Sequence, residues 1–400
     1  MMKKINSAKI ILPSRLYAND AIVRDDGSED RTEETRRLGV VIGPPARAKS
    51  PELILFGGLH HFYTEFISSI AVSKLLPEFL TRFPLNEPYG PQGFFRLRNL
   101  EKRLKNVDVI SCIELYPFIS QQCAHLAKKE KKKLVVSVFE TVTSIPFTYS
   151  PPYSWNVKSV LKHADAFIAY TKRARDYLRR LCAPNGKIKV VYPGVDLQAF
   201  SPLNRRDHEN FRILFVGRLS HSKGISLLLK AFSRLYAGNK NVELWMCGAG
   251  QRGGQEEVLA RAMAKRHPIR ILGYVEHGSL PDVQRECDVL CLPSIDMRKC
   301  GIKVWEEQFG FVLVEAMACG LPIVATNCGA IPEVIGSRNI IVPQESSDAL
   351  YLALRGIMED DAMRQDISRA NRARAESLFD IKKQREKFEK ILAGCFDERA

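Results

Sequence analysis

The stretch EQFGFVLVEAMACGLPIVAT, residues 307–326, decides the fold of this chain. Gly310 precedes a short apolar segment, Gly320 fits the position just after a helix, and Pro322 cannot continue one. The β-branched run that begins at Pro322 is typical of a buried strand. A buried helix followed at once by a buried strand indicates a parallel sheet that helices cover on both faces.

The second half of the chain repeats this alternation. Residues 222–236 carry apolar side chains at spacings of three and four, which predicts one buried face of a helix. We expect strands at residues 211–217, 242–247, 269–272, 289–292, 322–326 and 340–342. A doubly wound sheet of this kind binds its ligands outside the carboxyl ends of the strands.

The first half follows the same pattern less regularly. We expect strands at residues 9–12, 40–43, 53–56, 107–112, 134–139, 166–169 and 188–191, and irregular segments at 19–51, 82–95 and 142–155. A polar stretch with Pro and Gly at 192–208 marks a domain boundary. The sequence thus predicts an α/β protein of two doubly wound Rossmann-like domains, 1–195 and 196–378, facing each other across a cleft. A charged helix at 379–400 is expected to pack back on the first domain.

The composition is that of a soluble globular protein. Of the 400 residues, 45% are hydrophobic and 26% are charged, which excludes wholesale disorder, collagen and coiled coil. No apolar run is long enough for a membrane helix, and the run at 10–12 is too short for a signal peptide. The ten cysteines form no C-x-x-C pair, so we expect buried reduced thiols, no metal site and a cytoplasmic location.

The net charge of +15 is concentrated in the first half of the chain. Residues 1–200 hold 31 Lys and Arg against 19 Asp and Glu, whereas residues 201–400 hold 29 against 26. A basic half suits a phosphorylated acceptor, peripheral contact with the inner face of an anionic membrane, or nucleic acid. For runs such as 128–133 a solvated surface is the simpler interpretation. No nucleic-acid motif appears, so no nucleic-acid partner is expected.

Two cations follow the first strand of the second half. Gly217 ends that strand, Arg218 comes next, and Lys223 is expected in the first turn of the following helix. A cation at a helix N-terminus is unfavourable unless an anion joins it. For either cation alone a solvent-facing side chain is the better interpretation, but the two together at a strand's carboxyl end predict a phosphate site.

A glycine-rich turn follows the next strand. Gly248 and Gly250 open a formal G-x-G-x-x-G. A dinucleotide site would need an acidic residue at the end of the following strand, and Glu276 comes only after Gly273 and Tyr274. We therefore interpret the motif as a tight turn that lets the backbone approach a ligand.

The opening stretch contains two glutamates, one before the helix and one inside it. Glu307 precedes the helix, and Glu315 lies within it among apolar side chains. A carboxylate in such surroundings needs a partner. A ribose diol of a bound nucleotide is one candidate, and an arginine of the chain is the other.

In order and spacing, these motifs resemble those of the group 1 (family 4) retaining glycosyltransferases, which have the GT-B fold. The resemblance covers nearly all of residues 188–345. It rests on Gly-Arg…Lys-Gly (217–224), Gly-x-Gly (248–250), Gly-Tyr-Val (273–275), Leu-Pro-Ser (292–294), the E-x₇-E pair Glu307…Glu315, and 329–335.

The resemblance implies a role for each motif. Arg218 and Lys223 would hold the diphosphate of a nucleotide-sugar, and Glu315 the ribose. The base would lie against Tyr274, Val275 and Pro293, and the turns at Gly217, Gly248 and Gly250 would line the donor. Glu307, with the backbone of Gly310, Phe311 and Val312, would hold the sugar and its phosphate.

The implied reaction moves a hexose, from GDP-mannose or a UDP-sugar, to a hydroxyl of a lipid, glycan or small molecule. Anomeric configuration would be retained by a front-face route, with Glu307, Arg218, Lys223 and Glu140 as catalytic residues. No cofactor or metal is expected, since two cations and a helix N-terminus can stabilise the diphosphate and the sequence contains no Asp-x-Asp.

Three features depart from the family pattern, and the mildest is Gly329-Ala330 in place of a usual Gly-Gly. Many members carry a histidine after the strand at 134–139, where this chain has Glu140. Glu140 either orients the acceptor or serves as base, or it bonds to nearby backbone. The loop at 295–306 is longer and more basic than expected, which suits contact with acceptor or sugar.

Four residues near the chain's beginning complete the expected acceptor side, together with Arg173. Gly57 and Gly58 resemble the family's N-terminal glycine loop, and His60 and His61 follow them. A single histidine is more often structural than catalytic, so each remains an open assignment.

Three further classes of function stay open. A catalytically silent GT-B subunit that regulates a partner transferase would explain the missing histidine. A sugar-nucleotide epimerase of the same fold would change its donor without an acceptor. A nucleic-acid-binding protein would explain the basic charge.

Overall fold

The computed structural model describes residues 38–41, 100–104, 109–143, 151, 153–202, 209–250 and 254–397. The chain divides into two compact units. Unit 1 comprises Met1–Tyr170, Ala174–Val191 and Arg385–Ala400, and unit 2 comprises Thr171–Arg173 and Tyr192–Gln384.

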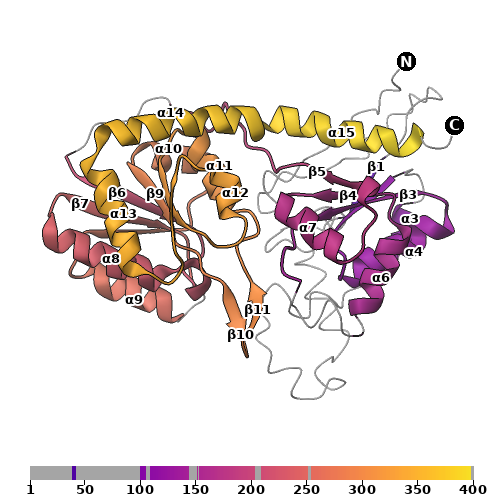
Figure 1. The fold of residues 1–400 in the computed structure, drawn as a ribbon, viewed down its shortest axis with the longest axis horizontal. Helices are drawn as coiled ribbons and strands as arrows, with labels where there is room; N and C mark the ends of the chain where they lie inside the picture. The colour runs from indigo at the N-terminus through magenta and orange to yellow at the C-terminus, as the bar shows by residue number, and fades with distance from the viewer. Residues whose placement is uncertain are drawn as a thin grey trace. The chain divides into compact units, whose positions relative to one another are not determined.

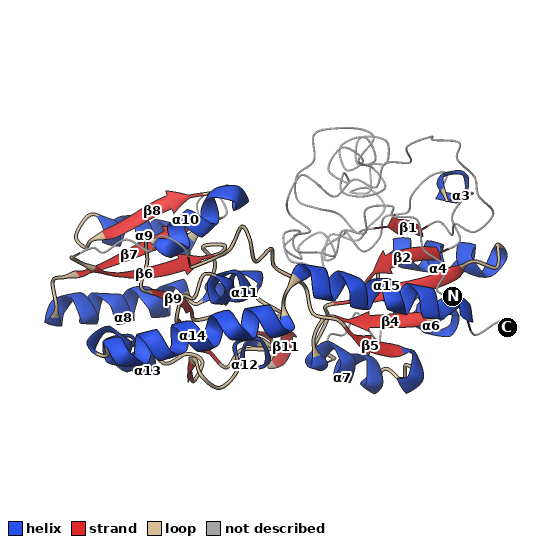
Figure 2. Cartoon of the chain, turned by 90° about the horizontal axis from the view of Figure 1, so that it is seen from above, coloured by secondary structure: helices blue, strands red, loops and turns tan. Residues whose placement is uncertain are grey.

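Unit 1 contains a parallel five-stranded sheet in the order β1-β2-β3-β4-β5 (Figure 2). Its strands are β1 (Leu38–Val41), β2 (Val109–Ile113), β3 (Lys133–Val138), β4 (Ala166–Ala169) and β5 (Ile188–Val190). Its helices are α3 (Leu100–Arg103), α4 (Phe118–Lys129), α6 (Tyr153–His163), α7 (Lys172–Arg180), the 3₁₀ turn η4 (Asn185–Lys187) and most of α15 (Ile381–Asp397). Every residue of β3 and β4 is buried, as expected for a sheet covered on both faces.

Unit 2 contains a parallel six-stranded sheet in the order β13-β12-β9-β6-β7-β8. Its strands are β6 (Phe211–Val216), β7 (Val242–Cys247), β8 (Ile269–Gly273), β9 (Val289–Leu292), β12 (Ile323–Thr326) and β13 (Ile340–Val342). The chain builds outward from β6 to β8, returns to pair β9 with the other side of β6, and continues outward to β13. This is the order of a dinucleotide-binding fold, whose direction reverses between β6 and β9.

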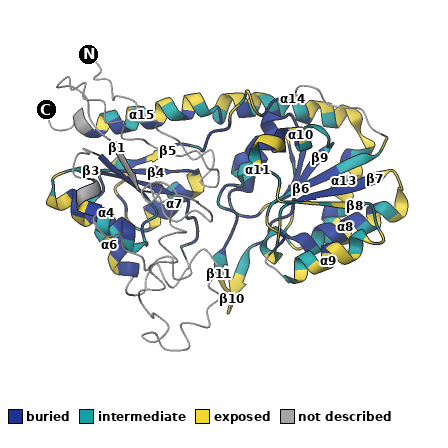
Figure 3. Cartoon of the chain, turned by 180° about the vertical axis from the view of Figure 1, so that it is seen from behind, coloured by how far each residue is buried: buried dark blue, intermediate teal, exposed yellow. Residues whose placement is uncertain are grey.

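Helices cover both faces of this sheet, with α8 and α9 on one face and α10 and α11 on the other (Figure 1). The helices and turns of unit 2 are η5 (His221–Lys223), α8 (Ile225–Gly238), α9 (Gln255–Ala264), η6 (His277–Ser279), α10 (Leu280–Arg285), α11 (Phe311–Ala318), α12 (Ile331–Ile335), α13 (Ser347–Glu359) and α14 (Asp361–Leu378). The strands β7, β9 and β12 are buried throughout, whereas exposed residues gather on the outer sides of α8 and α9 (Figure 3). This pattern follows from the apolar spacing of three and four along α8.

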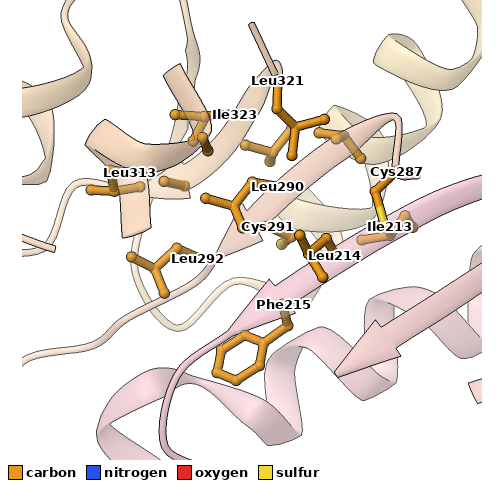
Figure 4. Close-up of a cluster of buried hydrophobic side chains, with 14 of the residues drawn as sticks. Ile213, Leu214, Phe215, Cys287, Leu290, Cys291, Leu292, Leu313, Leu321 and Ile323 are labelled. Carbon is orange, nitrogen blue, oxygen red and sulfur yellow. The ribbon is translucent and has the colours of Figure 1, made fainter. Parts of the chain in front are cut away.

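The core of unit 2 joins β6, β9 and α11. Figure 4 shows Leu214, Leu290 and Leu313 from these three elements in one apolar cluster, and all three are completely buried. The stretch that opens with Glu307 thus contributes both a helix and a strand, α11 and β12, to one core. Burial of such side chains contributes roughly 1.5–3 kcal/mol each.

The structure corrects three predictions. The segment at 295–306 is not a loop: it contains an antiparallel hairpin of β10 (Met297–Lys299) and β11 (Ile302–Trp305). Lys223 lies in the turn η5 rather than in a helix, because Gly224 has a φ of 67° and α8 starts only at Ile225. All ten cysteines are free, but Cys182 and Cys300 are exposed rather than buried.

The expected irregular segment at 142–155 ends earlier than predicted, since α6 begins at Tyr153. The expected strands at 9–12 and 53–56 lie outside the described residues. None of the helices that the structure describes is long and apolar enough to cross a membrane.

Candidate functional site

The reversal of strand order in unit 2 brings two predicted segments together at the carboxyl ends of neighbouring strands. β6 ends at Val216 and β9 at Leu292, and the two strands pair directly. Gly217 to Lys223 follow β6, while Pro293 and Ser294 follow β9. Ligands of open α/β sheets bind at this position because the two chain directions diverge there and leave room between the loops.

Two glycine turns meet at this edge. The Gly217 N–H donates to the carbonyl of Cys247 at 2.9 Å, and the Gly248 N–H donates to the carbonyl of Gly273 at 2.6 Å. A Cβ on Gly248 would lie 1.9 Å from the Gly217 carbonyl oxygen, and Gly248 has a φ of 135°. The close approach of the two backbones therefore requires glycine at position 248.

Lys223 and Glu307 form an ion pair beside this turn. The Lys223 Nζ lies 2.5 Å from the Glu307 Oε2, and the two side chains are only 14% and 8% exposed. The Ser294 hydroxyl donates to the same Oε2 at 2.8 Å. The structure thus brings together the predicted phosphate-binding cation and the first glutamate of the E-x₇-E pair.

The ring of Trp305 lies on the same lysine. The Lys223 Nζ is 5.2 Å from the ring centroid, within the range of a cation–π interaction. Trp305 ends β11 and is 8% exposed. The backbone N–H of Ile295, just before the hairpin, donates to the Ser222 carbonyl at 2.9 Å.

Residues 328–330 hold the backbone of Glu307 in place. The Ala330 N–H donates to the Glu307 carbonyl at 2.8 Å, and the Glu307 N–H lies 3.3 Å from the Cys328 sulfur. A Cβ on Gly329 would come within 2.1 Å of the Glu307 carbonyl oxygen. These contacts fix the position of the Glu307 backbone, and with it the point from which the Glu307 side chain extends.

α11 begins three residues after Glu307, with Gly310 as its N-cap. Phe311 and Val312 form its first turn and are partly buried. Because backbone N–H groups at a helix N-terminus carry a positive partial charge, this end of α11 adds such a charge on the side of Glu307. Glu315 lies further along this helix and is 4% exposed. Its Oε1 lies 3.3 Å from the Nε2 of His277, whose ring packs against Phe200 in a tilted arrangement with ring centroids 5.0 Å apart. The sequence left a ribose diol and an arginine open as partners of Glu315, and the structure adds a contact with a histidine.

The remaining predicted residues of unit 2 lie in the segments that follow β6, β7, β8 and β9. Arg218 is exposed and, among the described residues, has no ion-pair partner. The Gly250 N–H donates to the Glu257 carboxylate at 3.0 Å. Pro293 is buried, Val275 is partly buried, and Tyr274 is 70% exposed. A cation with no partner and an exposed aromatic ring beside the glycine turns both suit a ligand that carries phosphate and a base.

Glu140 follows β3 in unit 1 and is 1% exposed. Its Oε1 accepts hydrogen bonds from the backbone N–H groups of Thr141 and Val142, both at 2.8 Å. Of the two interpretations of this residue, bonding to nearby backbone is thus the one observed.

Glu114, which the sequence did not single out, follows β2 at a φ of 64°. Its Oε1 accepts from the N–H groups of Phe139 and Glu140. Its Oε2 is buried and has no hydrogen-bond partner in the described part of the chain. Burial, and then the charge of Glu140, raise the pKa of Glu114 to about 8.

Arg173 lies in α7 and clusters with unit 2. Its guanidinium donates to both carboxylate oxygens of Glu306, which also accepts from Lys303 at 2.9 Å. The hydrogen bond to Glu306 raises the pKa of Arg173. Gly57, Gly58, His60 and His61 lie outside the described residues.

Trp305, Ser294 and His277 are the contacts of the site that sequence reasoning missed. Ser294 was part of the Leu-Pro-Ser motif, so its position beside a strand end was available as a signal. His277 and Trp305 had no such signal, because their partners are distant in the sequence. No group of three metal-ligating side chains is found among the described residues.

Comparison with known families divides the chain into two matched parts. Residues 198–374 match the family described as "Glycosyl transferases group 1", and residues 57–199 match "Glycosyltransferase Family 4". Together the two matches cover most of the chain, and the first contains the whole group of contacts around Lys223 and Glu307.

Two curated relatives illustrate the likeness. The chain is 34% identical over 177 residues to a phosphatidyl-myo-inositol mannosyltransferase of Mycolicibacterium smegmatis, covering 43% of each protein. It is 29% identical over 233 residues to a D-inositol 3-phosphate glycosyltransferase of Pseudarthrobacter chlorophenolicus, covering 54% of this chain and 53% of the relative. The chain thus spans about half the length of the curated relatives it matches.

Solved structures share the fold at low sequence identity. HepE of Anabaena in complex with UDP has a TM-score of 0.65 and 17% identity, covering 90% of this chain and 100% of HepE. Sucrose-phosphate synthase of Thermosynechococcus elongatus has a TM-score of 0.60 and 17% identity, covering 91% and 100%. At this identity the likeness establishes the fold, two Rossmann-like units of GT-B type.

Proposed function

This chain belongs to the group 1 glycosyltransferases, and we propose that it moves a hexose from a nucleoside diphosphate sugar to an acceptor hydroxyl with retention of anomeric configuration. The observation that carries this proposal is the Lys223–Glu307 ion pair at the reversal point of the sheet in unit 2. A partly buried cation and a buried carboxylate beside a helix N-terminus suit a substrate that carries both phosphate and hydroxyl groups.

The chemistry assigned to these residues is stabilisation of a leaving diphosphate. As the bond between the anomeric carbon and the phosphate oxygen breaks, negative charge builds on that oxygen. We assign Lys223, Arg218 and the first N–H groups of α11 to the stabilisation of this charge. In the front-face route the departing oxygen takes the proton of the acceptor hydroxyl as the new bond forms on the same side.

Each remaining group receives one part of the donor. Glu315, held beside His277, would accept hydrogen bonds from the ribose hydroxyls. Tyr274, Val275 and Pro293 would line the base. Glu307 would accept from a sugar hydroxyl once the diphosphate replaces it as the partner of Lys223. In this proposal the chain's own cations neutralise the diphosphate.

The class of acceptor is proposed from the relatives and the charge. The names of the two relatives mention an inositol lipid and an inositol phosphate. Residues 1–200 hold 31 Lys and Arg against 19 Asp and Glu, which suits an anionic acceptor. We therefore place phosphorylated polyols and anionic lipids first among the acceptors to be tested, before neutral glycans.

The test begins with ligand binding to the whole chain. Thermal shift against UDP, GDP, ADP and their sugars identifies the base, since a ligand at 100 times its Kd adds about 2.7 kcal/mol of stability. Transfer from the radiolabelled donor to the acceptor panel then follows, with proton NMR of the product to read its anomeric configuration. An inverted product, or a chain that binds none of these nucleotides, would contradict the proposal.

One observation supports a second candidate, a catalytically silent subunit. Glu140 stands where many family members have a histidine, and its Oε1 is engaged by backbone N–H groups. A silent subunit would bind the donor yet neither transfer nor hydrolyse its sugar with any acceptor. Measured turnover of donor would exclude this candidate.

A further inference from the structure

We infer that Trp305 is a positioning residue for the donor diphosphate: its ring holds the Lys223 ammonium at the strand reversal without neutralising it. The inference rests on the proposed function, because it assigns Lys223 to the diphosphate. The carrying observation is that one lysine meets a carboxylate at 2.5 Å and an indole ring at 5.2 Å.

The two partners of Lys223 differ in what they leave for a ligand. Glu307 cancels the lysine charge, so an arriving diphosphate must compete with that carboxylate for the ammonium. The indole attracts the cation through its quadrupole and takes no proton from it. When a diphosphate replaces Glu307 as the ion-pair partner of Lys223, the ring therefore keeps the ammonium in place. The positive charge of the lysine is then available to the ligand.

Trp305 is itself held firmly by the hairpin that sequence analysis took for a loop. It ends β11 and is paired in register with Met297 of β10. Next to it, Lys303 bridges the carboxylates of Asp296 and Glu306 at 2.5 and 2.9 Å. A ring fixed in this way costs little further ordering when a ligand binds.

Trp305 also packs in the apolar core of unit 2, so simple packing is the competing explanation. The chain offers a matched control in Trp245, which is 9% exposed against 8% for Trp305. Trp245 also lies under cations, with Arg212 and Arg270 at 4.9 and 5.1 Å from its ring. Those cations pair with Glu243 and take no part in the proposed site.

The experiment compares Trp305→Leu, Trp305→Phe and Trp245→Leu in the full chain. Binding of UDP and GDP is measured by calorimetry, and binding of uridine and guanosine by ligand-observed NMR. For the base that binds, Trp305→Leu should weaken diphosphate binding by about threefold to thirtyfold, the range of a cation–π contact. The nucleoside should bind within a factor of two of wild type, because it lacks the phosphates.

Two further variants separate positioning from packing. Trp305→Phe keeps a smaller ring and should recover part of the diphosphate affinity, even where the leucine variant folds poorly. Trp245→Leu should lose stability and leave the ratio of diphosphate to nucleoside affinity unchanged.

Three results would overturn the inference. Equal weakening of nucleoside and diphosphate by Trp305→Leu would show a packing role, and unchanged diphosphate binding would remove the role altogether. A Trp305→Phe variant no better than leucine would show that the ring does not act on the cation. Failure of the proposed function itself is distinguishable, because then the wild-type chain binds neither UDP nor GDP.

Discussion

Gly329 lies directly against the backbone of Glu307, so that a Cβ at position 329 would stand 2.1 Å from the Glu307 carbonyl oxygen. The two segments are far apart in sequence, and the neighbouring Ala330 N–H donates to that same oxygen at 2.8 Å. The loop after β12 thus fixes the position of Glu307, the proposed sugar-binding carboxylate. Position 329 itself tolerates no side chain.

Gly329→Ala should therefore displace Glu307 and lower both transfer and stability. The φ of 54° adds strain for any L residue, so we expect a loss of at least about 2 kcal/mol in the free energy of unfolding. Denaturant unfolding and transfer rates measure the two effects. Gly278→Ala is the control, because a Cβ there would meet no atom within 4 Å, and it should behave as wild type.

Lys223→Ala should lower transfer by about 100- to 1,000-fold, the usual effect of losing one stabilising group of a transition state. It also leaves the buried Glu307 without its cation, at a cost of about 3–5 kcal/mol in stability. Lys230→Ala on α8 provides the control, since Lys230 is exposed and should change neither quantity. Wild-type turnover in Lys223→Ala would remove the lysine from the mechanism.

Glu315→Gln should weaken binding of the nucleotide through its ribose alone. A neutral amide accepts hydrogen bonds from a diol less strongly than a carboxylate, and we expect a loss of about tenfold in affinity. The 2′,3′-dideoxy form of the same nucleoside diphosphate, measured by calorimetry, should bind wild type and variant alike. A variant that loses affinity for both forms equally would place Glu315 away from the ribose.

Glu114 should make the stability of unit 1 depend on pH. Burial, and then the charge of Glu140, raise its pKa from 4.5 to about 8, so the folded chain binds this proton more tightly than the unfolded chain. The stabilising contribution of the proton is complete below about pH 4.5 and is lost as the pH rises toward 8.

Glu114→Gln keeps the shape of the side chain and cannot ionise, so it removes this dependence. Relative to the variant, wild type should lose about 1–3 kcal/mol between pH 5 and pH 8, as read from denaturant unfolding at each pH. Comparison with the variant cancels the titration of all other groups. Unfolding curves that stay parallel across this range would show that Glu114 is charged in the folded chain at neutral pH.

The parallel sheet of unit 2 could be predicted from local sequence patterns. The strand at 242–247 was predicted at both ends, and α11 with β12 followed from Gly310, Gly320 and Pro322. Each of these signals lies within one element, where capping and periodicity act. Lys223 and Glu307 were named from the family pattern, and the structure places them in contact.

Long-range contacts account for what the sequence did not reveal. The hairpin has only three residues in β10 and four in β11, and Lys303 forms ion pairs with Asp296 and Glu306. The ring of Trp305 lies on Lys223, although the two residues are 82 positions apart in the sequence (305 − 223 = 82). Which side chains meet in these contacts depends on how the folded chain packs. The hydrophobic periodicity of the sequence carries no information about those pairings.

The two exposed thiols have a practical use. Cys182 belongs to unit 1 and Cys300 to the turn of the hairpin in unit 2, while the other eight cysteines are buried. The unaltered chain therefore already carries one accessible attachment point for a spin label on each unit. Pulsed dipolar spectroscopy on such a doubly labelled sample, with and without nucleotide, would yield the distribution of separations between the halves and reveal whether a donor narrows it.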